Sequence, residues 1–311
     1  MSDTATMAAT VAATEHDVEA ARIERRRRFR SNTLPALVTV GPVTLWLLAF
    51  IAVPLLYILI MGFCSTDQYY NVAYSFTLDN FQAMLDPEYL KIYGQSILIA
   101  AISTVICLVL AYPFSYLISR TFKSKKTLLY MMIIIPFWTN SLVRIYGWRT
   151  FLSATGQLNT FLMAIGATSE PIQFLYNQAC TVFGMAYDMF PFMVLPLYAA
   201  IEKLDESQIE ASFDLGANML TTIFKVVIPQ TMSGIFSGCI MVFIPSLGAF
   251  YISDILGGGN ADVIGNLIQR QFQSANDWPL GAALSILLIA ITLLLVKIYQ
   301  KAGGDMESLG V

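Results

Sequence analysis

The chain has 311 residues, of which 56% are hydrophobic and only 13% are charged, with a formal net charge of −3. Soluble domains carry about 25% charged residues, so this composition argues against a soluble enzyme and favours an all-α polytopic membrane protein. The four cysteines occur singly and His16 is the one histidine, which argues against a disulfide framework or a metal site. The small net charge argues against nucleic acid as a partner.

Residues 1–33 are rich in Ala, Thr and Glu and then become strongly basic. Arg26-Arg27-Arg28-Phe29 resembles the core of a twin-arginine signal only weakly. The apolar segment that follows is far longer than the roughly 7–15 apolar residues of a signal peptide, and no small-residue cleavage site is evident. We therefore expect residues 1–33 to form a basic cytoplasmic tail and the next segment to remain as a membrane anchor.

Six stretches with little or no charge are long enough to cross a membrane, which takes roughly 17–25 mostly apolar residues in a helix. The uncharged segment 150–169 is rich in Ser, Thr, Gly, Gln and Asn, and predicts an interfacial or re-entrant loop instead. We therefore predict six transmembrane helices within a membrane domain at 34–300. The six stretches are about 35–63, Lys91 to Arg120, Lys126 to Arg144, Glu170 to Glu202 with Asp188 as its one charge, Lys225 to Asp254, and Asp277 to Lys297.

The basic residues indicate the orientation, because cytoplasmic loops of membrane proteins retain an excess of Lys and Arg. Fourteen of the 18 Lys and Arg residues fall in the first tail, near 119–127, within 201–227 and at the last helix end. We therefore expect both termini, including the tail 301–311, to be cytoplasmic. The other four bases, on the opposite side, are Lys91, Arg144, Arg149 and Arg270.

The predicted cytoplasmic loop at 201–229 carries five acids where positive charge would be expected. Apolar residues alternate with these acids at spacings that favour short amphipathic helices, and Gly216 permits a tight break between them. This pattern predicts a docking site for a partner. The five acids are Glu202, Asp205, Glu206, Glu210 and Asp214.

This loop resembles the EAA loop of ABC importer permeases, which reads Glu-Ala-Ala, three residues, Gly, nine residues, Ile-x-Leu-Pro. Here the corresponding residues are Glu210-Ala211-Ser212, then Gly216, then Val226-Val227-Ile228-Pro229, at the same spacing. The resemblance implies a type I importer permease bundle in which residues around 202–220 form a coupling helix seated on a cytoplasmic ATPase. The residues it implies for coupling are Glu210, Ala211, Ser212, Asp214, Gly216 and Pro229.

The chain contains no Gly-x-x-x-x-Gly-Lys-Ser/Thr motif, so it has no P-loop to hold ATP phosphates. We expect ATP and Mg²⁺ to be bound by a separate ATPase, and we predict neither a cofactor nor a catalytic residue for this chain. Its role would then be translocation, without enzymatic activity.

Further motifs resemble a narrower group, the permease subunits of spermidine/putrescine ABC importers, from about residue 40 to 300. The resemblance implies a second permease subunit, an ATPase dimer and a periplasmic binding protein as partners, in a bacterial inner membrane. The motifs are Pro136 to Asn140, Leu142 to Arg144, Trp148, Pro191 to Tyr198, Phe250 to Asp254, Gly257-Gly258 and Asp277 to Pro279.

A polyamine is a flexible polycation, best held by carboxylates and by aromatic faces, with about 0.5–2 kcal/mol for each cation–π contact. Tyr251 and Asp254 are three residues apart and share a face if helical. The resemblance implies that both meet the polyamine, and Trp148 joins them on the predicted substrate path. The alternatives are an ordinary interfacial acid for Asp254 and an aromatic-belt residue for Tyr251.

Asp188 lies in the middle of an apolar segment, where a carboxylate costs about 2.5–3.5 kcal/mol on insertion scales. Members of the resembled family commonly carry Asn there, so three roles remain open: contact with a cation, a gate, or a hydrogen-bonded partner for another helix. Arg144 is interpreted as an outer-surface arginine that anchors the third helix or meets an acidic binding protein.

Three other functions are considered. One is an ABC permease for another cationic or small polar solute. Another is an ion-gradient-driven transporter with Asp188 as its proton or sodium site, but the EAA-like loop argues against it and no inverted repeat is evident. A membrane enzyme would need a constellation of catalytic groups that the sequence does not contain.

Overall fold

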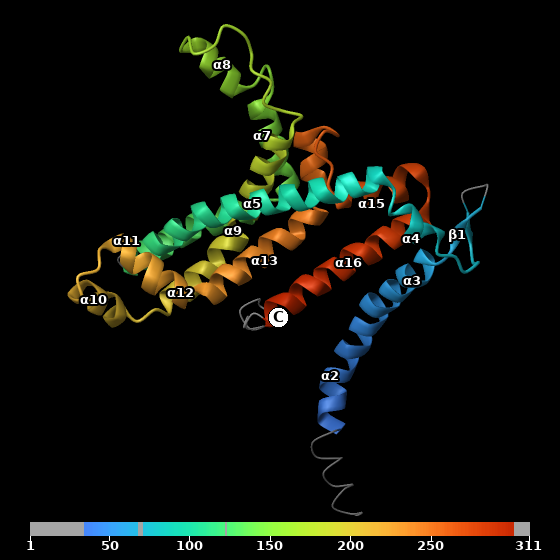
Figure 1. Cartoon of the computed structure of the whole chain (residues 1–311), viewed down its shortest axis with the longest axis horizontal. Coiled ribbons are helices and arrows are strands. Elements are labelled where there is room, and N and C mark those ends of the chain that lie inside the picture. The colour runs from blue at the N-terminus through green and yellow to red at the C-terminus, as the bar shows by residue number, and fades with distance from the viewer. Residues whose placement is uncertain (1–33, 68–70, 122, 302–311) are drawn as a thin grey trace, which may run out of the picture. The chain divides into compact units, whose positions relative to one another are not determined.

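The computed structural model describes residues 34–67, 71–121 and 123–301, and most of them lie in helices (Figure 1). The predicted tails 1–33 and 301–311 therefore lie outside the described residues, except for Lys301. The chain divides into two compact units, 1–60 and 61–311, which are described separately.

The first unit contains α2 (Leu34–Leu47), the π-helical turn η2 (Leu48–Ala52) and most of α3 (Val53–Gly62). Together they form an apolar stretch, Thr39–Gly62, that is long enough to cross a membrane. Its large side chains are exposed, among them Leu45, Phe50 and Ile60. Exposed apolar side chains along a whole helix suit hydrocarbon surroundings.

The second unit begins with a short antiparallel pair, β1 (Ser65–Thr66) and β2 (Val72–Ala73), in which Ser65 pairs with Ala73. The short helix α4 (Asp79–Ala83) leads to the long helix α5 (Pro87–Ser119). Asp86 caps α5 by accepting a hydrogen bond from the Glu88 amide at 3.0 Å, and Pro87 occupies the first helical position.

The later elements follow in chain order: α6 (Lys123–Phe137), α7 (Ser141–Leu152), α8 (Gln157–Ala164), α9 (Gln178–Glu202), α10 (Glu206–Asp214), α11 (Met219–Thr222), η3 (Ile223–Val227), α12 (Ile228–Gln230), α13 (Met232–Gly248), α14 (Phe250–Ile252), η4 (Ser253–Gly257), α15 (Ile264–Arg270), η5 (Gln271–Ala275) and α16 (Trp278–Lys301). Figure 1 shows α7 and α8 extending away from the bundle of α5, α9 and α13. The segment 150–169, predicted as a loop, contains the eight-residue helix α8.

The structure supports a helical membrane protein but does not fix the number of spans. Four described segments are long and apolar enough to cross a membrane: Thr39–Gly62, α5, α9 and α16. Met219–Gln230 and Met232–Gly248 give a fifth if this pair, bent by 72°, is one span. At the third predicted span, α6 has only 15 residues, fewer than the roughly 17 needed. Six spans are consistent with these helices and stay a prediction.

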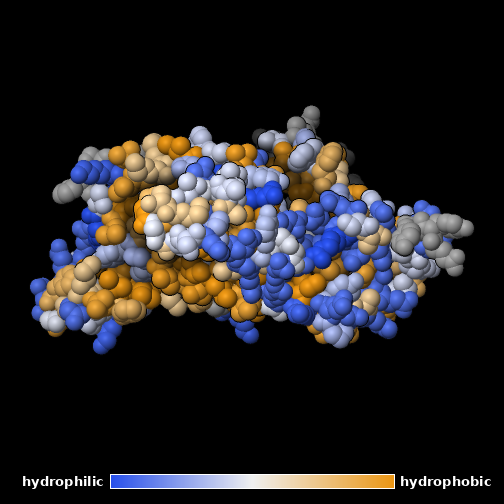
Figure 2. Space-filling model, turned by 90° about the horizontal axis from the view of Figure 1, so that it is seen from above, coloured by the Kyte–Doolittle hydropathy of each residue, from blue (hydrophilic) through white to orange (hydrophobic). Residues whose placement is uncertain are grey.

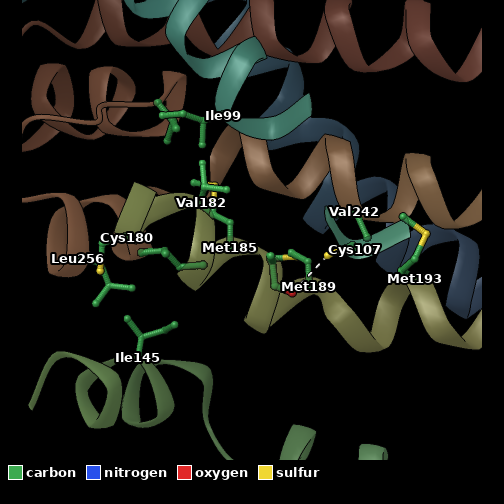
Figure 3. Packing of buried hydrophobic residues seen from close by; sticks show 14 of the residues in the cluster. Ile99, Cys107, Ile145, Cys180, Val182, Met185, Met189, Met193, Val242 and Leu256 are labelled. Carbon is green, nitrogen blue, oxygen red and sulfur yellow. Dashed lines mark hydrogen bonds between the residues drawn. The ribbon is translucent and has the colours of Figure 1, made fainter. Parts of the chain in front are cut away.

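The core of the second unit is formed where α5, α9 and α13 pack together. Donors on α5 bond carbonyl oxygens of α9 at a constant offset: Ser103 to Val182 at 3.5 Å, Cys107 to Ala186 at 3.2 Å and Ser115 to Val194 at 3.4 Å. Figure 3 shows the Cys107 bond among Val182, Met185, Met189 and Met193. Small polar residues that allow close approach are typical of helix contacts in membranes.

Glycine brings α13 close to α9. A Cβ atom at Gly234 would lie 2.8 Å from the Pro196 carbonyl oxygen and 2.5 Å from the Ala200 Cβ atom. The outer face of α5 is apolar, with Leu98, Val105 and Val109 exposed. Orange, hydrophobic areas lie beside blue, hydrophilic ones on the surface drawn in Figure 2. Exposed Leu293 and Ile298 on α16 belong to this type of surface.

Candidate functional site

The central polar feature of the second unit is a group of four side chains, Asp188 of α9 and its three partners Arg144, Ser141 and Tyr251, here called the carboxylate cluster. Oδ1 of Asp188 accepts hydrogen bonds from Ser141 Oγ at 2.6 Å and Arg144 Nη2 at 2.8 Å. Oδ2 accepts one from the Tyr251 hydroxyl at 2.8 Å, and that hydroxyl lies 3.0 Å from Ser141 Oγ. The cluster joins α9, α7 and α14.

The start of α7 positions two of these groups. Asn140 caps the helix by accepting a hydrogen bond from the Leu142 amide at 2.8 Å. Ser141, Arg144 and Ile145 then share one helix face by their spacing. Figure 3 shows Ile145 directed towards the core residues near Leu256 and Cys180. Packing of this apolar residue places Ser141 and Arg144 beside Asp188.

The interpretation of Arg144 as an outer-surface anchor is wrong, because its side chain is buried against Asp188. The side chains of Arg144 and Asp188 are only 9% and 5% exposed. The guanidinium also lies over the rings of Phe137 and Tyr187, at 5.6 Å from each ring centroid. A buried charge without a partner is strongly destabilising. Arg144 and Asp188 therefore each compensate the buried charge of the other.

Asp188 thus adopts one of its three expected roles, a hydrogen-bonded partner for other helices. The sequence pointed to Asp188 and Tyr251 but not to Ser141, and its pattern predicted Arg144 at the outer surface. One feature of the sequence could have predicted the ion pair. Arg144 is a single base at the edge of one apolar segment, and Asp188 is a single acid in the centre of another.

A cavity of about 520 Å³ adjoins the cluster, between α5, α6, α7 and α9. Its walls are apolar and aromatic, with Tyr187, Phe190 and Pro191 from α9, and Arg144 is the charged group in its lining. Trp148 does not line the cavity but contacts residues that do. Its ring packs edge-on against Phe183 and Tyr187, with centroids 4.8 and 5.4 Å apart. Trp148 therefore supports the aromatic lining.

Asp254 lies outside the carboxylate cluster. Its Oδ1 accepts a hydrogen bond from Asn266 Nδ2 at 2.6 Å, and Asn266 also caps α15 by accepting from the Val263 amide at 2.9 Å. Asp254 is exposed, whereas Tyr251 is partly buried. The backbone changes from α14 to the π-helical η4 between them. The two residues that were expected to share a face therefore have different partners.

The EAA-like segment folds as two short helices around a tight turn. Asp205 caps α10 by accepting a hydrogen bond from the Ser207 amide at 3.0 Å, and this bond lowers the pKa of the Asp205 carboxyl. At the other end Gly216 has φ +82°, its amide bonds the Phe213 oxygen at 2.9 Å, and the Ala217 amide bonds the Ser212 oxygen at 3.0 Å. This pair of bonds is the Schellman motif, which favours Gly at its left-handed position.

Ser212, which replaces the second Ala of the resembled motif, joins the two helices. Its Oγ bonds the Ile209 carbonyl oxygen at 2.7 Å and lies 2.8 Å from Thr222 Oγ1 in α11. Glu210, Ala211, Asp214 and Pro229 are exposed. Five large apolar side chains are also exposed here and are called the coupling surface: Phe213, Leu215, Met219, Leu220 and Phe224.

Two ion pairs connect this segment to the ends of neighbouring helices. Arg120 at the end of α5 contacts Glu206 of α10 at 2.8 Å, and Lys126 of α6 contacts Glu202 of α9 at 2.8 Å. Among the residues that the structure describes, no group of three or more His, Cys, Asp or Glu side chains is arranged to hold a metal ion.

This chain is similar to known proteins in both sequence and fold. The chain is 43% identical to the spermidine/putrescine transport system permease protein PotB of Escherichia coli (strain K12) over 257 residues, which cover 83% of this chain and 94% of that protein. It is 40% identical to PotB of Haemophilus influenzae over 265 residues, covering 85% and 93%. A bacterial alginate ABC transporter, solved with its alginate-bound periplasmic protein, contains a chain that superposes with a TM-score of 0.70 at 18% identity, over 88% of this chain and 94% of that one.

Residues 111–302 match the family described as "Binding-protein-dependent transport system inner membrane component". This match covers more than half of the chain and includes α9, the EAA-like segment and α16. The chain therefore belongs to the family of binding-protein-dependent transport system inner membrane components.

Proposed function

We propose that this chain is a transmembrane permease subunit of an ATP-driven importer that passes a polyamine of the spermidine/putrescine class into the cytoplasm. The observation that carries this proposal is the 43% identity to a spermidine/putrescine permease over 83% of the chain. The permease itself performs no chemistry on its substrate.

The proposed partners are a second permease subunit, an ATPase dimer that binds ATP and Mg²⁺, and a periplasmic binding protein. The coupling surface supports the ATPase assignment, because Leu215 is 89% exposed and Leu220 66% exposed on a polar loop. Large exposed apolar groups rimmed by polar residues mark protein interaction sites. Closure of the ATPase would move α10, and the ion pair from Glu206 to Arg120 would carry that motion to α5.

The proposed boundaries follow the charge pattern: a basic cytoplasmic tail at 1–33, a membrane domain at 34–300 with its coupling loop at 201–229, and a cytoplasmic tail at 301–311. Both termini would be on the cytoplasmic side of the inner membrane, because most of the Lys and Arg residues fall on that side.

The proposed substrate path includes Tyr251, Asp254, Asp188 and Trp148. Asp254 is exposed with one amide partner, so its carboxylate retains acceptor capacity for an ammonium group. Tyr251 and the aromatic wall that Trp148 supports offer ring faces to the methylene chain and cationic groups of a polyamine.

Uptake in cells tests the substrate. The chain and the subunits encoded with it would be expressed in a bacterial strain deleted for its own polyamine importers, and uptake of labelled spermidine and putrescine would be measured. We expect uptake that excess unlabelled polyamine abolishes and neutral sugars do not affect. Uptake of another cationic solute, with none of either polyamine, would keep the family and reject this substrate.

A further inference from the structure

The carboxylate cluster has a property that the proposed function does not use: its acid is already occupied by a cation. Arg144 Nη2 bonds Asp188 Oδ1 at 2.8 Å, and both side chains are at least nine-tenths buried. The cavity beside them is lined by Arg144, with aromatic and apolar walls. A polycation that entered this cavity would therefore meet a guanidinium in front of the carboxylate.

We infer that Arg144 is a resident counter-ion of Asp188, and that the permease accepts a cationic substrate at this carboxylate by exchanging the guanidinium for a substrate ammonium group. This inference rests on the proposed function, because it requires a cationic substrate. It makes Arg144 a residue that determines when and how strongly the path holds a cation.

The carboxylate is prepared for such an exchange. Ser141 at 2.6 Å and Tyr251 at 2.8 Å bond its two oxygens independently of Arg144. These neutral donors would hold the carboxylate in place when the guanidinium leaves, and an ammonium group would take over the charge compensation. The buried acid would then have a cationic partner both before and after the exchange, as a buried charge requires.

Aromatic rings also hold the guanidinium, independently of the carboxylate. It lies 5.6 Å from the ring centroids of Phe137 and Tyr187, and Tyr187 lines the cavity beside the ion pair. Its Nε is buried and has no hydrogen-bond partner within the described part of the chain. Arg144 is therefore held to Asp188 by one nitrogen. A contact through one nitrogen is weaker than a bidentate contact and is more readily exchanged.

Direct binding tests this inference separately from transport. Labelled spermidine would be titrated into the purified complex of this chain with its co-purifying subunits in nanodiscs, without the binding protein, so that the affinity of that protein does not enter. Arg144→Gln should lower the Kd for spermidine about tenfold or more, because the apparent Kd rises as the inverse of the fraction of molecules in which Arg144 has left the carboxylate. The double variant Arg144→Gln/Asp188→Asn should lose this gain.

Arg149→Gln is the matched control, since Arg149 lies on the same helix, is exposed and contacts the ring of Tyr146. It should bind spermidine as the unmodified complex does. If Arg144→Gln does not assemble, Arg144→Lys decides, because its point charge is strongly hydrated and more weakly fixed to the carboxylate. That variant should also bind more tightly than the unmodified complex.

Equal or weaker binding by an assembled Arg144 variant would overturn the exchange, and so would tighter binding that persists in the double variant. ATP-dependent spermidine uptake by the unmodified complex is measured in parallel. If this uptake is present, either result overturns the exchange alone. If it is absent, the proposed function fails and the exchange fails with it.

Discussion

The hydroxyl groups of Ser212 and Thr222 lie 2.8 Å apart and join α10 to α11 behind the turn at Gly216. Both side chains are buried. Because the single Ser212 hydroxyl proton is directed to the Ile209 carbonyl oxygen, Thr222 is the donor in this pair. The EAA-like segment is thus fixed internally by side chains as well as by its backbone turn.

Ser212→Ala should weaken this connection, although Ala occupies this place in the resembled motif. The substitution leaves the buried Thr222 hydroxyl without its acceptor, at a cost of about 1–3 kcal/mol. The double variant Ser212→Ala/Thr222→Val removes both polar groups and should recover most of that loss. The thermal midpoint of the complex and its ATPase rate with binding protein would be measured. A double variant that is less stable than Ser212→Ala would contradict this account.

Gly216→Val should uncouple ATP hydrolysis from uptake. A left-handed backbone costs a residue with a side chain about 1–2 kcal/mol, so the turn after α10 should open. Gly166→Val is the control, because Gly166 has φ +72° and, like Gly216, has free space for a Cβ atom, but it follows α8. ATP hydrolysed per polyamine transported should rise for Gly216→Val and stay unchanged for Gly166→Val. Equal effects would remove the special role of this turn.

Gly234→Ala should destabilise the contact between α13 and α9. The added Cβ atom would collide with backbone at Pro196, and overpacking of this kind costs about 1–3 kcal/mol. Gly94→Ala, at an exposed helical site in α5 with no atom within 4 Å of the added carbon, should gain about 0.5–1 kcal/mol instead. Thermal unfolding of the purified complex in detergent checks both signs. A tolerated Gly234→Ala would mean that the helices can separate there freely.

Asp254→Asn should reduce uptake of a polycation without dissociating the complex. The new side-chain oxygen can still accept from Asn266, so the local structure is kept while the negative charge is lost. Loss of about 1.4 kcal/mol of interaction would lower uptake about tenfold at limiting substrate. Asp79→Asn, at the exposed start of α4, serves as the control. Unchanged uptake in Asp254→Asn would remove this residue from the substrate path.

Asp188→Asn should be more harmful than its small change in shape suggests. It leaves the Arg144 guanidinium buried and uncompensated, which costs about 3–5 kcal/mol. Adding Arg144→Gln should restore part of that stability. A double-mutant cycle on the thermal unfolding of the complex measures the coupling. Additive losses would show that the two charges do not depend on each other.

The sequence predicted the features that arise from local composition or local spacing. The helices α5, α9 and α16 follow runs with little or no charge. The short helices around Gly216 follow a motif in which Gly is needed for the left-handed backbone of the turn. The packing of α7 against α9 could not be predicted in this way, because it depends on Ile145 meeting core residues that are distant in sequence. Arg144 was assigned wrongly for that reason: a base next to an apolar run is typical of a membrane surface until its buried partner is known.

The measurement that tests the central claim most directly is uptake of labelled spermidine and putrescine into proteoliposomes. These would contain this chain with its co-purifying subunits, with the binding protein outside and ATP either enclosed or absent. We expect accumulation with enclosed ATP, and none with ATP absent even when a proton or sodium gradient is imposed. Gradient-driven uptake by this chain alone, without ATP, would contradict the account.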